Sequence, residues 1–157
     1  MKKLLLTLLS VSFLLSCGPS KDDAVMLDTI MLGHVNSCTN AEKTFWASFR
    51  TNKNALSEFM AIVKNTKHSL ESMGYNDLQK LKDAGINVFD AYIKAEPLYA
   101  EGAKLGLLPN DSIRFEEKVV QAKLVEAKIS SALELVFKEL ELVRKEFASK
   151  YGYEVYY

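Results

Sequence analysis

Apolar side chains recur every three or four residues over most of the chain. The clearest run lies between residues 112 and 150, a stretch that contains neither Gly nor Pro. Such spacing places the apolar side chains on one face of an α-helix, and at 1.5 Å per residue this helix would be roughly 55–60 Å long. The positions on this face are Phe115, Val119, Ala122, Glu126, Ile129, Leu133, Val136, Leu140, Val143 and Phe147.

The same spacing extends from residue 31 to residue 73 and favours one long helical rod. Ser20 and Asp23 have the spacing of a capping box at its start, and Gly74 is placed to end it. Residues 36–40 have low helix propensity, so we expect the rod to kink or break there. The positions on its apolar face are Met31, Val35, Cys38, Glu42, Phe45, Phe49, Asn52, Leu56, Phe59, Val63, Thr66, Leu70 and Met73.

A further helix is predicted from residue 76 onward, with Asn76 as its N-cap. Pro97 cannot donate a backbone hydrogen bond, so a kink or a new first turn is expected there. The helix should fade between Gly102 and Gly106. Its apolar face carries Leu78, Leu81, Gly85, Val88, Tyr92, Ala95 and Tyr99.

Together these patterns predict an all-α fold. Residues 21–157 would form one antiparallel bundle of three long helices, or of four if the first rod breaks near residues 36–40. Abundant Leu, Ala, Glu and Lys, with only three Pro residues, agree with helix throughout. The length of this region suits a single domain.

The first seventeen residues form a separate unit. Lys2 and Lys3 precede a nearly pure apolar run, which ends in Leu14-Leu15-Ser16-Cys17. The run is about a dozen residues long, too short for the ~20 residues of a membrane-spanning helix. The segment resembles a bacterial lipoprotein signal peptide with its lipobox. The resemblance implies that residues 1–16 are cleaved and that Cys17, as the new N-terminus, carries a diacylglyceryl group and a further acyl chain such as palmitate.

The resemblance also implies a location. Two acyl chains are enough for stable anchoring, so the membrane is the first expected partner, and residues 17–20 would form the lipidated cysteine and a short linker. Gly18 rather than Asp follows the cysteine, which resembles the class sorted to the outer rather than the inner membrane in Gram-negative hosts. The alternatives are an ordinary secretory signal, with Cys17 incidental, and an uncleaved membrane anchor.

Charge and motifs limit the function classes. The chain has 20 Lys and Arg and 20 Asp and Glu residues without a basic block, so we expect no nucleic-acid partner. No paired-carboxylate, Ser/His/Asp or Cys/His arrangement and no phosphate-binding loop is visible. With two His residues in the whole chain, we expect no enzymatic activity and no cofactor.

His34, Cys38 and Glu42 lie four residues apart and share a helical face. Imidazole and thiolate are good zinc ligands, so His34 and Cys38 are weak candidates for a metal site. The competing interpretation, which we favour, makes Cys38 a buried apolar residue, His34 a surface residue and Glu42 a helix cap. A second alternative is a disulfide through Cys38 between two chains.

Two aromatic groups are weak candidates for a binding surface. Trp46, with Phe45 and Phe49, could line a ligand pocket or simply pack in the core. The C-terminal tail is rich in Tyr, which is enriched at protein interfaces, but a tail can also pack on its own bundle. Its candidate residues are Tyr153, Tyr156 and Tyr157.

These observations predict a lipid-anchored protein of the bacterial cell envelope. Its helical domain would be non-catalytic and would act through protein–protein interaction, with an envelope or host protein as partner. The alternative is a membrane-tethered helical bundle that binds a small ligand or a metal.

Overall fold

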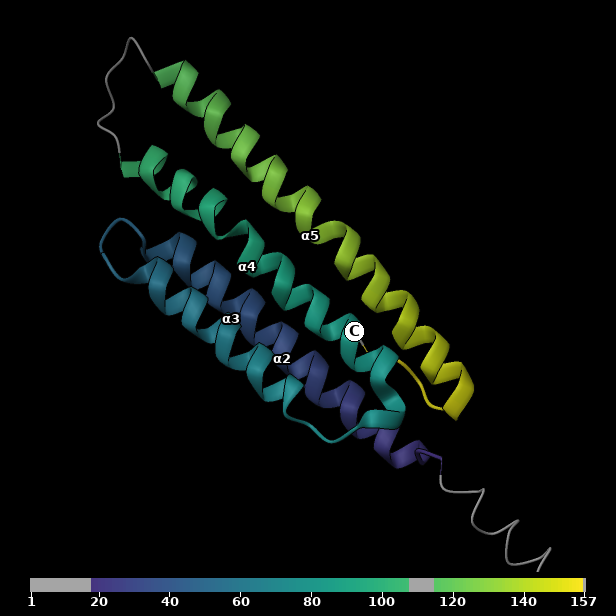
Figure 1. Cartoon of the computed structure of the whole chain (residues 1–157). Coiled ribbons are helices and arrows are strands. Elements are labelled where there is room, and N and C mark those ends of the chain that lie inside the picture. The colour runs from purple at the N-terminus through teal and green to yellow at the C-terminus, as the bar shows by residue number, and fades with distance from the viewer. Residues whose placement is uncertain (1–17, 108–114, 157) are drawn as a thin grey trace, which may run out of the picture.

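The computed structural model describes residues 18–107 and 115–156, and these form an all-α bundle (Figure 1). No strand occurs within these two ranges. The predicted signal peptide, Cys17, residues 108–114 and Tyr157 lie outside the described residues. The helices are α2 (Lys21–Ser48), α3 (Ala55–Glu71), the 3-10 turn η1 (Asn76–Leu78), α4 (Gln79–Leu107) and α5 (Phe115–Tyr151).

Consecutive helices run antiparallel and lie side by side, and α5 returns to α2 to close the bundle (Figure 1). Helix α4 contacts all three of the other helices. Helix α5 has 37 residues, which gives the predicted length of about 55 Å. Its N-terminal end extends beyond the α2–α3 turn, whereas its C-terminal end lies beside the start of α2.

The predicted capping box at the start of α2 is confirmed. The Ser20 hydroxyl accepts a hydrogen bond from the Asp23 backbone N–H at 3.1 Å, and the Asp23 carboxylate accepts one from the Ser20 N–H at 3.0 Å. Two N–H groups that the first helical turn leaves without a partner are thereby satisfied. The helix therefore begins three residues after Gly18, at the end of a very short linker.

The fourth helix arises from a break at a different place from the one predicted. Helix α2 runs unbroken through residues 36–40, and the chain turns at residues 49–54 instead. The hydroxyls of Ser37 and Thr39 donate to the carbonyl groups four residues earlier, which lets both residues stay within a helix. At the turn, the Asn52 N–H donates to the Ser48 carbonyl, and the Asn52 side chain accepts from the Asn54 N–H.

Helix α4 also departs from expectation in three details. Asn76 lies in η1, and no side-chain hydrogen bond caps that turn. The helix passes Pro97 without ending and continues to Leu107. Gly102 and Gly106 remain helical, and aromatic rings pack closely against both. A Cβ atom at Gly102 would be 2.8 Å from Trp46 Cη2, and one at Gly106 would be 2.6 Å from Phe49 Cζ.

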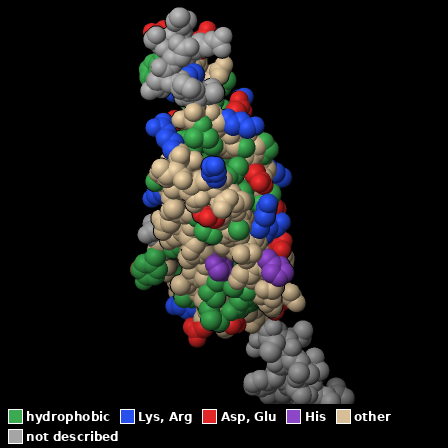
Figure 2. Space-filling model, turned by 90° about the vertical axis from the view of Figure 1, so that its left-hand side faces the viewer, with side chains coloured by type: hydrophobic (Ala, Val, Ile, Leu, Met, Phe, Trp, Pro, Cys, Tyr) green, Lys and Arg blue, Asp and Glu red, His purple; other side chains and the backbone are tan. Residues whose placement is uncertain are grey.

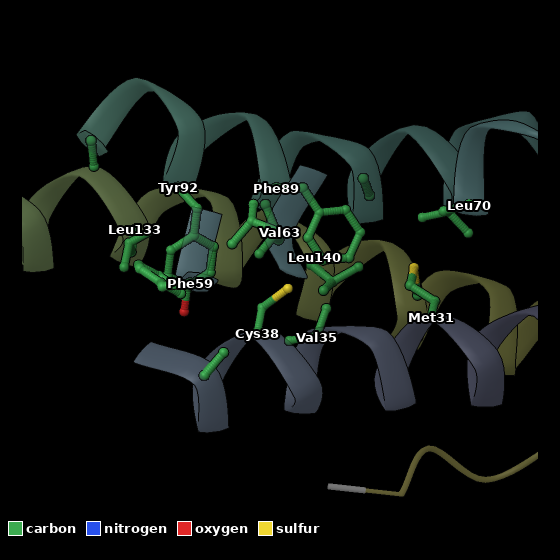
Figure 3. Close-up of a cluster of buried hydrophobic side chains, with 14 of the residues drawn as sticks. Met31, Val35, Cys38, Phe59, Val63, Leu70, Phe89, Tyr92, Leu133 and Leu140 are labelled. Atoms are coloured by element: carbon green, nitrogen blue, oxygen red, sulfur yellow. The ribbon is translucent and has the colours of Figure 1, made fainter. Parts of the chain in front are cut away.

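The core confirms most of the predicted apolar faces. Figure 3 shows side chains from all four helices meeting there, among them Cys38 of α2, Val63 of α3, Phe89 of α4 and Leu140 of α5. The prediction was wrong for the first turns of α5, where Phe115 and Ala122 are exposed. Both residues line hollows between the helices, Ala122 beside Trp46 and Phe115 beside Phe49, so neither side chain is covered.

On the outer surface, acidic and basic side chains are interspersed over the face drawn in Figure 2. Lys67, for example, lies 2.7 Å from Asp90 and 3.4 Å from Glu71. Within the described ranges, none of the helices combines the length and the apolar character that a bilayer-spanning segment requires.

Candidate functional site

A cleft of about 400 Å³ lies between α2, α4 and the first half of α5. This volume falls within the range of small-molecule sites, about 300–1,000 Å³. The lining combines two carboxylates, one indole ring and an apolar wall. Its residues are Glu42, Trp46, Gly102, Ala122, Val125, Glu126, Ile129 and Ser130.

The Glu42 carboxylate is held in place by two tyrosines of α4. The Tyr99 hydroxyl donates to Glu42 Oε1 at 2.6 Å, and the Tyr92 hydroxyl donates to Oε2 at 3.1 Å. Both rings are almost completely buried. Burial, and then the nearby Glu42 carboxylate, raise the pKa of both phenols. The phenols therefore stay protonated and keep donating to Glu42, which is part of the cleft lining and not a helix cap.

Trp46 forms the aromatic wall of the cleft and is packed against other rings. Its centroid lies 4.7 Å from that of Phe45, 5.9 Å from that of Phe49 and 5.7 Å from that of Tyr99. About a third of the residue remains exposed, at 36%. The core interpretation is confirmed for Phe45, whereas Trp46 lines a cavity, and its role in ligand binding stays a prediction.

His34 and Cys38 are not brought together with a third ligand. Among the described residues, no group of three or more His, Cys, Asp or Glu side chains is arranged to hold a metal ion. Cys38 is a free, fully buried thiol whose pKa is raised by burial to about 11. Because metal ligation requires the thiolate, this environment works against it. His34 is half-buried rather than exposed, and within the described part of the chain its Nε2 atom has no hydrogen-bond partner.

The C-terminal tail packs on the bundle. Tyr153 is half-buried, and burial, then the Asp28 carboxylate, raises the pKa of its phenol to about 12. The Tyr156 carbonyl accepts a hydrogen bond from Arg144 Nη2 at 2.8 Å, while the Tyr156 side chain itself is exposed. Tyr157 lies outside the described residues. The tail is therefore part of the fold, and Tyr156 is its exposed aromatic residue.

A buried ion pair beneath the tail was missed by sequence reasoning. Arg144 Nε and Nη2 donate to the two carboxylate oxygens of Asp28 at 2.6 and 3.1 Å. Both side chains are nearly inaccessible to solvent. The only signal in the sequence is that each residue directly follows a core position, Leu27 and Val143.

An exposed apolar stripe on the outer face of α5 was missed as well. Val120, Leu124, Leu135 and Leu142 are 54–71% exposed. Their spacings of 4, 11 and 7 residues put them on one helical face, opposite the face that packs on the bundle. We call this set the α5 stripe. The spacing of the stripe can be read in the sequence, but the apolar residues on the buried face of α5 recur more regularly, and the prediction followed them instead.

Comparison with protein-family models, with curated proteins and with solved structures found no match. The cleft and the α5 stripe are therefore the features from which a function can be inferred.

Proposed function

We propose that this chain is a lipid-anchored protein of the bacterial cell envelope whose helical domain binds another protein and catalyses no reaction. The observation that supports this most is the α5 stripe, because large apolar side chains aligned on one exposed face are typical of interaction surfaces. The lipobox-like segment ending at Cys17 supports the anchor.

The shape of the α5 stripe suits an amphipathic helix as its occupant. From Val120 to Leu142 the stripe extends ~33 Å at 1.5 Å per residue. Its intervals of 4, 11 and 7 residues keep all four side chains on one helical face, as a helix that packs on a second helix requires. The ion pairs Glu134–Lys138 and Glu141–Lys145 provide charged side chains on the same helix, as expected for the polar rim of an interface. The proposed partner is an envelope or host protein that presents such a helix.

An anchor at Cys17 would also set the orientation of the domain. The start of α2 and the tail lie at the end of the bundle next to the linker (Figure 1). The cleft is lined by Trp46 near the other end of α2, which ends at Ser48. Trp46 is 25 residues beyond Lys21 in α2, which corresponds to ~38 Å along the helix. The cleft and the first half of α5 would then face away from the lipid surface.

The anchor is tested by Cys17→Ala in the full chain. We expect this variant to leave the membrane fraction and to lack the acyl mass, with unchanged helical circular dichroism. Cys38→Ala is the matched control, because it also removes one thiol but leaves the anchor. Membrane retention of Cys17→Ala, or a parent protein that begins at a residue other than Cys17 or carries no acyl mass, would contradict the anchor.

The binding surface is tested by photo-crosslinking from position 135 in cells. We expect a cross-link to an amphipathic helix of another envelope or host protein, and Leu124→Glu should abolish it. Met26→Glu, an exposed apolar residue on α2, serves as control and should leave the cross-link intact. A cross-link to α5 of a second copy, or a product insensitive to Leu124→Glu, would refute the proposed partner.

A second candidate function is ligand binding within the bundle. The cleft favours it, because the cleft combines an apolar wall with a few fixed polar groups, as ligand sites do.

A further inference from the structure

We infer that the Trp46 cleft binds an organic cation, namely an ammonium or guanidinium group on an apolar stem. The cation could belong to a free amine or to a Lys or Arg side chain. This inference rests on the second function proposed above, ligand binding within the bundle, and it names the class of ligand.

The charge of the cleft is the first reason to expect a cationic ligand. Among the residues that the structure describes, the ionisable ones that line the cleft are Glu42 and Glu126. Among the described residues, neither carboxylate forms an ion pair with a Lys or Arg side chain. Each Glu42 oxygen accepts one tyrosine hydrogen bond, but an ionised carboxylate has about four acceptor positions. Glu42 can therefore accept further hydrogen bonds from a cationic ligand.

The indole ring of Trp46 is the second reason to expect a cationic ligand. An indole ring is the side chain over which a cation is held best, because the ring face is electron-rich. Trp46 lines the same cleft as Glu42 and Glu126 and is held by packing against Phe45 and Tyr99. A cation in the cleft would contact both the ring and the carboxylates, and both interactions favour its binding.

The apolar wall of the cleft is the reason to expect an apolar stem on the ligand. Val125 and Ile129 line the cleft one helical turn apart on α5. Long cationic side chains and alkylamines bury their methylene groups against such surfaces and keep the charged head at the polar end. An anion would be repelled by the two carboxylates. A neutral alkyl group would desolvate Glu42 without offering it a hydrogen bond, which is unfavourable.

The surroundings restrict where the charge can sit. A neighbouring hollow shares Trp46, Gly102 and Ala122 with the cleft, and its lining includes Arg50. A cationic head is repelled from that hollow and drawn to the side of Glu42 and Glu126. Repulsion by Arg50 and attraction by Glu42 and Glu126 would together place the charged head on the carboxylate side of the cleft.

The test uses the mature full-length protein and its own fluorophore. Trp46 is the single tryptophan of the chain, so its emission reports directly on the cleft. We expect a saturable change in emission with n-butylamine, and no saturable change with butanol or butyrate at the same concentrations. N-acetyl-lysine methylamide distinguishes the sources: binding at least tenfold tighter than butylamine identifies a protein side chain, and weaker binding identifies a free amine.

Charge-removing variants complete the test. Glu126→Gln, at an exposed position, should weaken butylamine binding at least threefold, and Glu42→Gln at least tenfold. Glu139→Gln, exposed on the same helix and outside the cleft, should bind like the parent. Because Glu126 is exposed, its variant keeps the test decisive if Glu42→Gln fails to fold.

The results distinguish a cleft that does not prefer cations from a cleft that binds no ligand. If butanol binds as well as butylamine, or if Glu126→Gln and Glu42→Gln both bind like the parent, the cation is refuted while ligand binding survives. If none of the probes changes the emission of Trp46, ligand binding in this cleft is refuted as well.

Discussion

Replacing Arg144 by Met should remove a large part of the stability of the bundle. The change keeps the length of the side chain but leaves the Asp28 carboxylate buried without its two hydrogen bonds from Arg144. It also deprives the Tyr156 carbonyl of its donor. Breaking one partner of a buried ion pair destabilises a protein by about 3–5 kcal/mol. Since a domain of this size is stable by only about 5–15 kcal/mol, the loss would be easy to measure.

The assay is urea unfolding followed by circular dichroism at 222 nm. With a denaturant dependence near 2 kcal/mol per molar urea, the midpoint should fall by roughly 2 M. The control is Lys145→Met at the next position, where an exposed pair with Glu141 is removed. Exposed pairs contribute about 0–1 kcal/mol, so this control should shift the midpoint by less than 0.5 M.

A double variant separates the loss of attraction from the penalty of an unpaired charge. Asp28→Leu combined with Arg144→Met replaces both charges by apolar groups, and such replacements of buried pairs are often neutral or stabilising. We therefore expect the double variant to recover most of the lost stability. The reasoning is refuted if Arg144→Met is no more destabilising than Lys145→Met, or if the double variant is the least stable of the three.

Two further predictions concern the core. The Cys38 thiol, whose pKa burial raises to about 11, should resist a thiol reagent at pH 8 in the folded protein and react fully in urea. Since the thiol of the unfolded chain ionises near its usual 9.0, stability should fall as the pH rises from 9 to 11, and Cys38→Ala should lessen that fall. Fast labelling of the folded protein would contradict this burial. Gly85→Ala should lower the thermal midpoint, because its Cβ atom would lie 2.7 Å from Met31 Sδ and 2.9 Å from Leu70 Cδ2. Gly33→Ala, with no atom within 4 Å of the new Cβ, should raise the midpoint through its gain of up to about 1 kcal/mol in helix propensity. Equal shifts in the two variants would show that the contacts at Gly85 do not matter.

The all-α fold could be predicted because its signal is local. Residues that face the core of a helix recur with a fixed period, so Met31, Val63, Tyr92 and Leu140 were identified as inward positions without knowing their neighbours. The turn at residues 49–54 was harder to predict, since Asn52 was one of several polar residues that interrupt the pattern.

Contacts between helices could not be predicted in the same way. Glu42 and Tyr99 are 57 residues apart, and Asp28 and Arg144 are 116 residues apart. The periodicity of one helix does not define how far its neighbour is shifted along the bundle axis. The cleft depends on that shift, and so the sequence identified Trp46 as a candidate but did not place Glu42 and Glu126 beside it.

The Asp28–Arg144 pair joins the first helix after the linker directly to the last helix of the chain. If the N-terminus is tethered and a partner pulls on α5, this joint carries part of the mechanical load directly between α2 and α5, alongside the packing of both helices on α4. Because α2 and α5 lie side by side in opposite directions, such a force would slide the two helices against each other rather than peel them apart one contact at a time. Two oxygen atoms and one guanidinium group near the start of α2 would then contribute directly to the resistance to pulling.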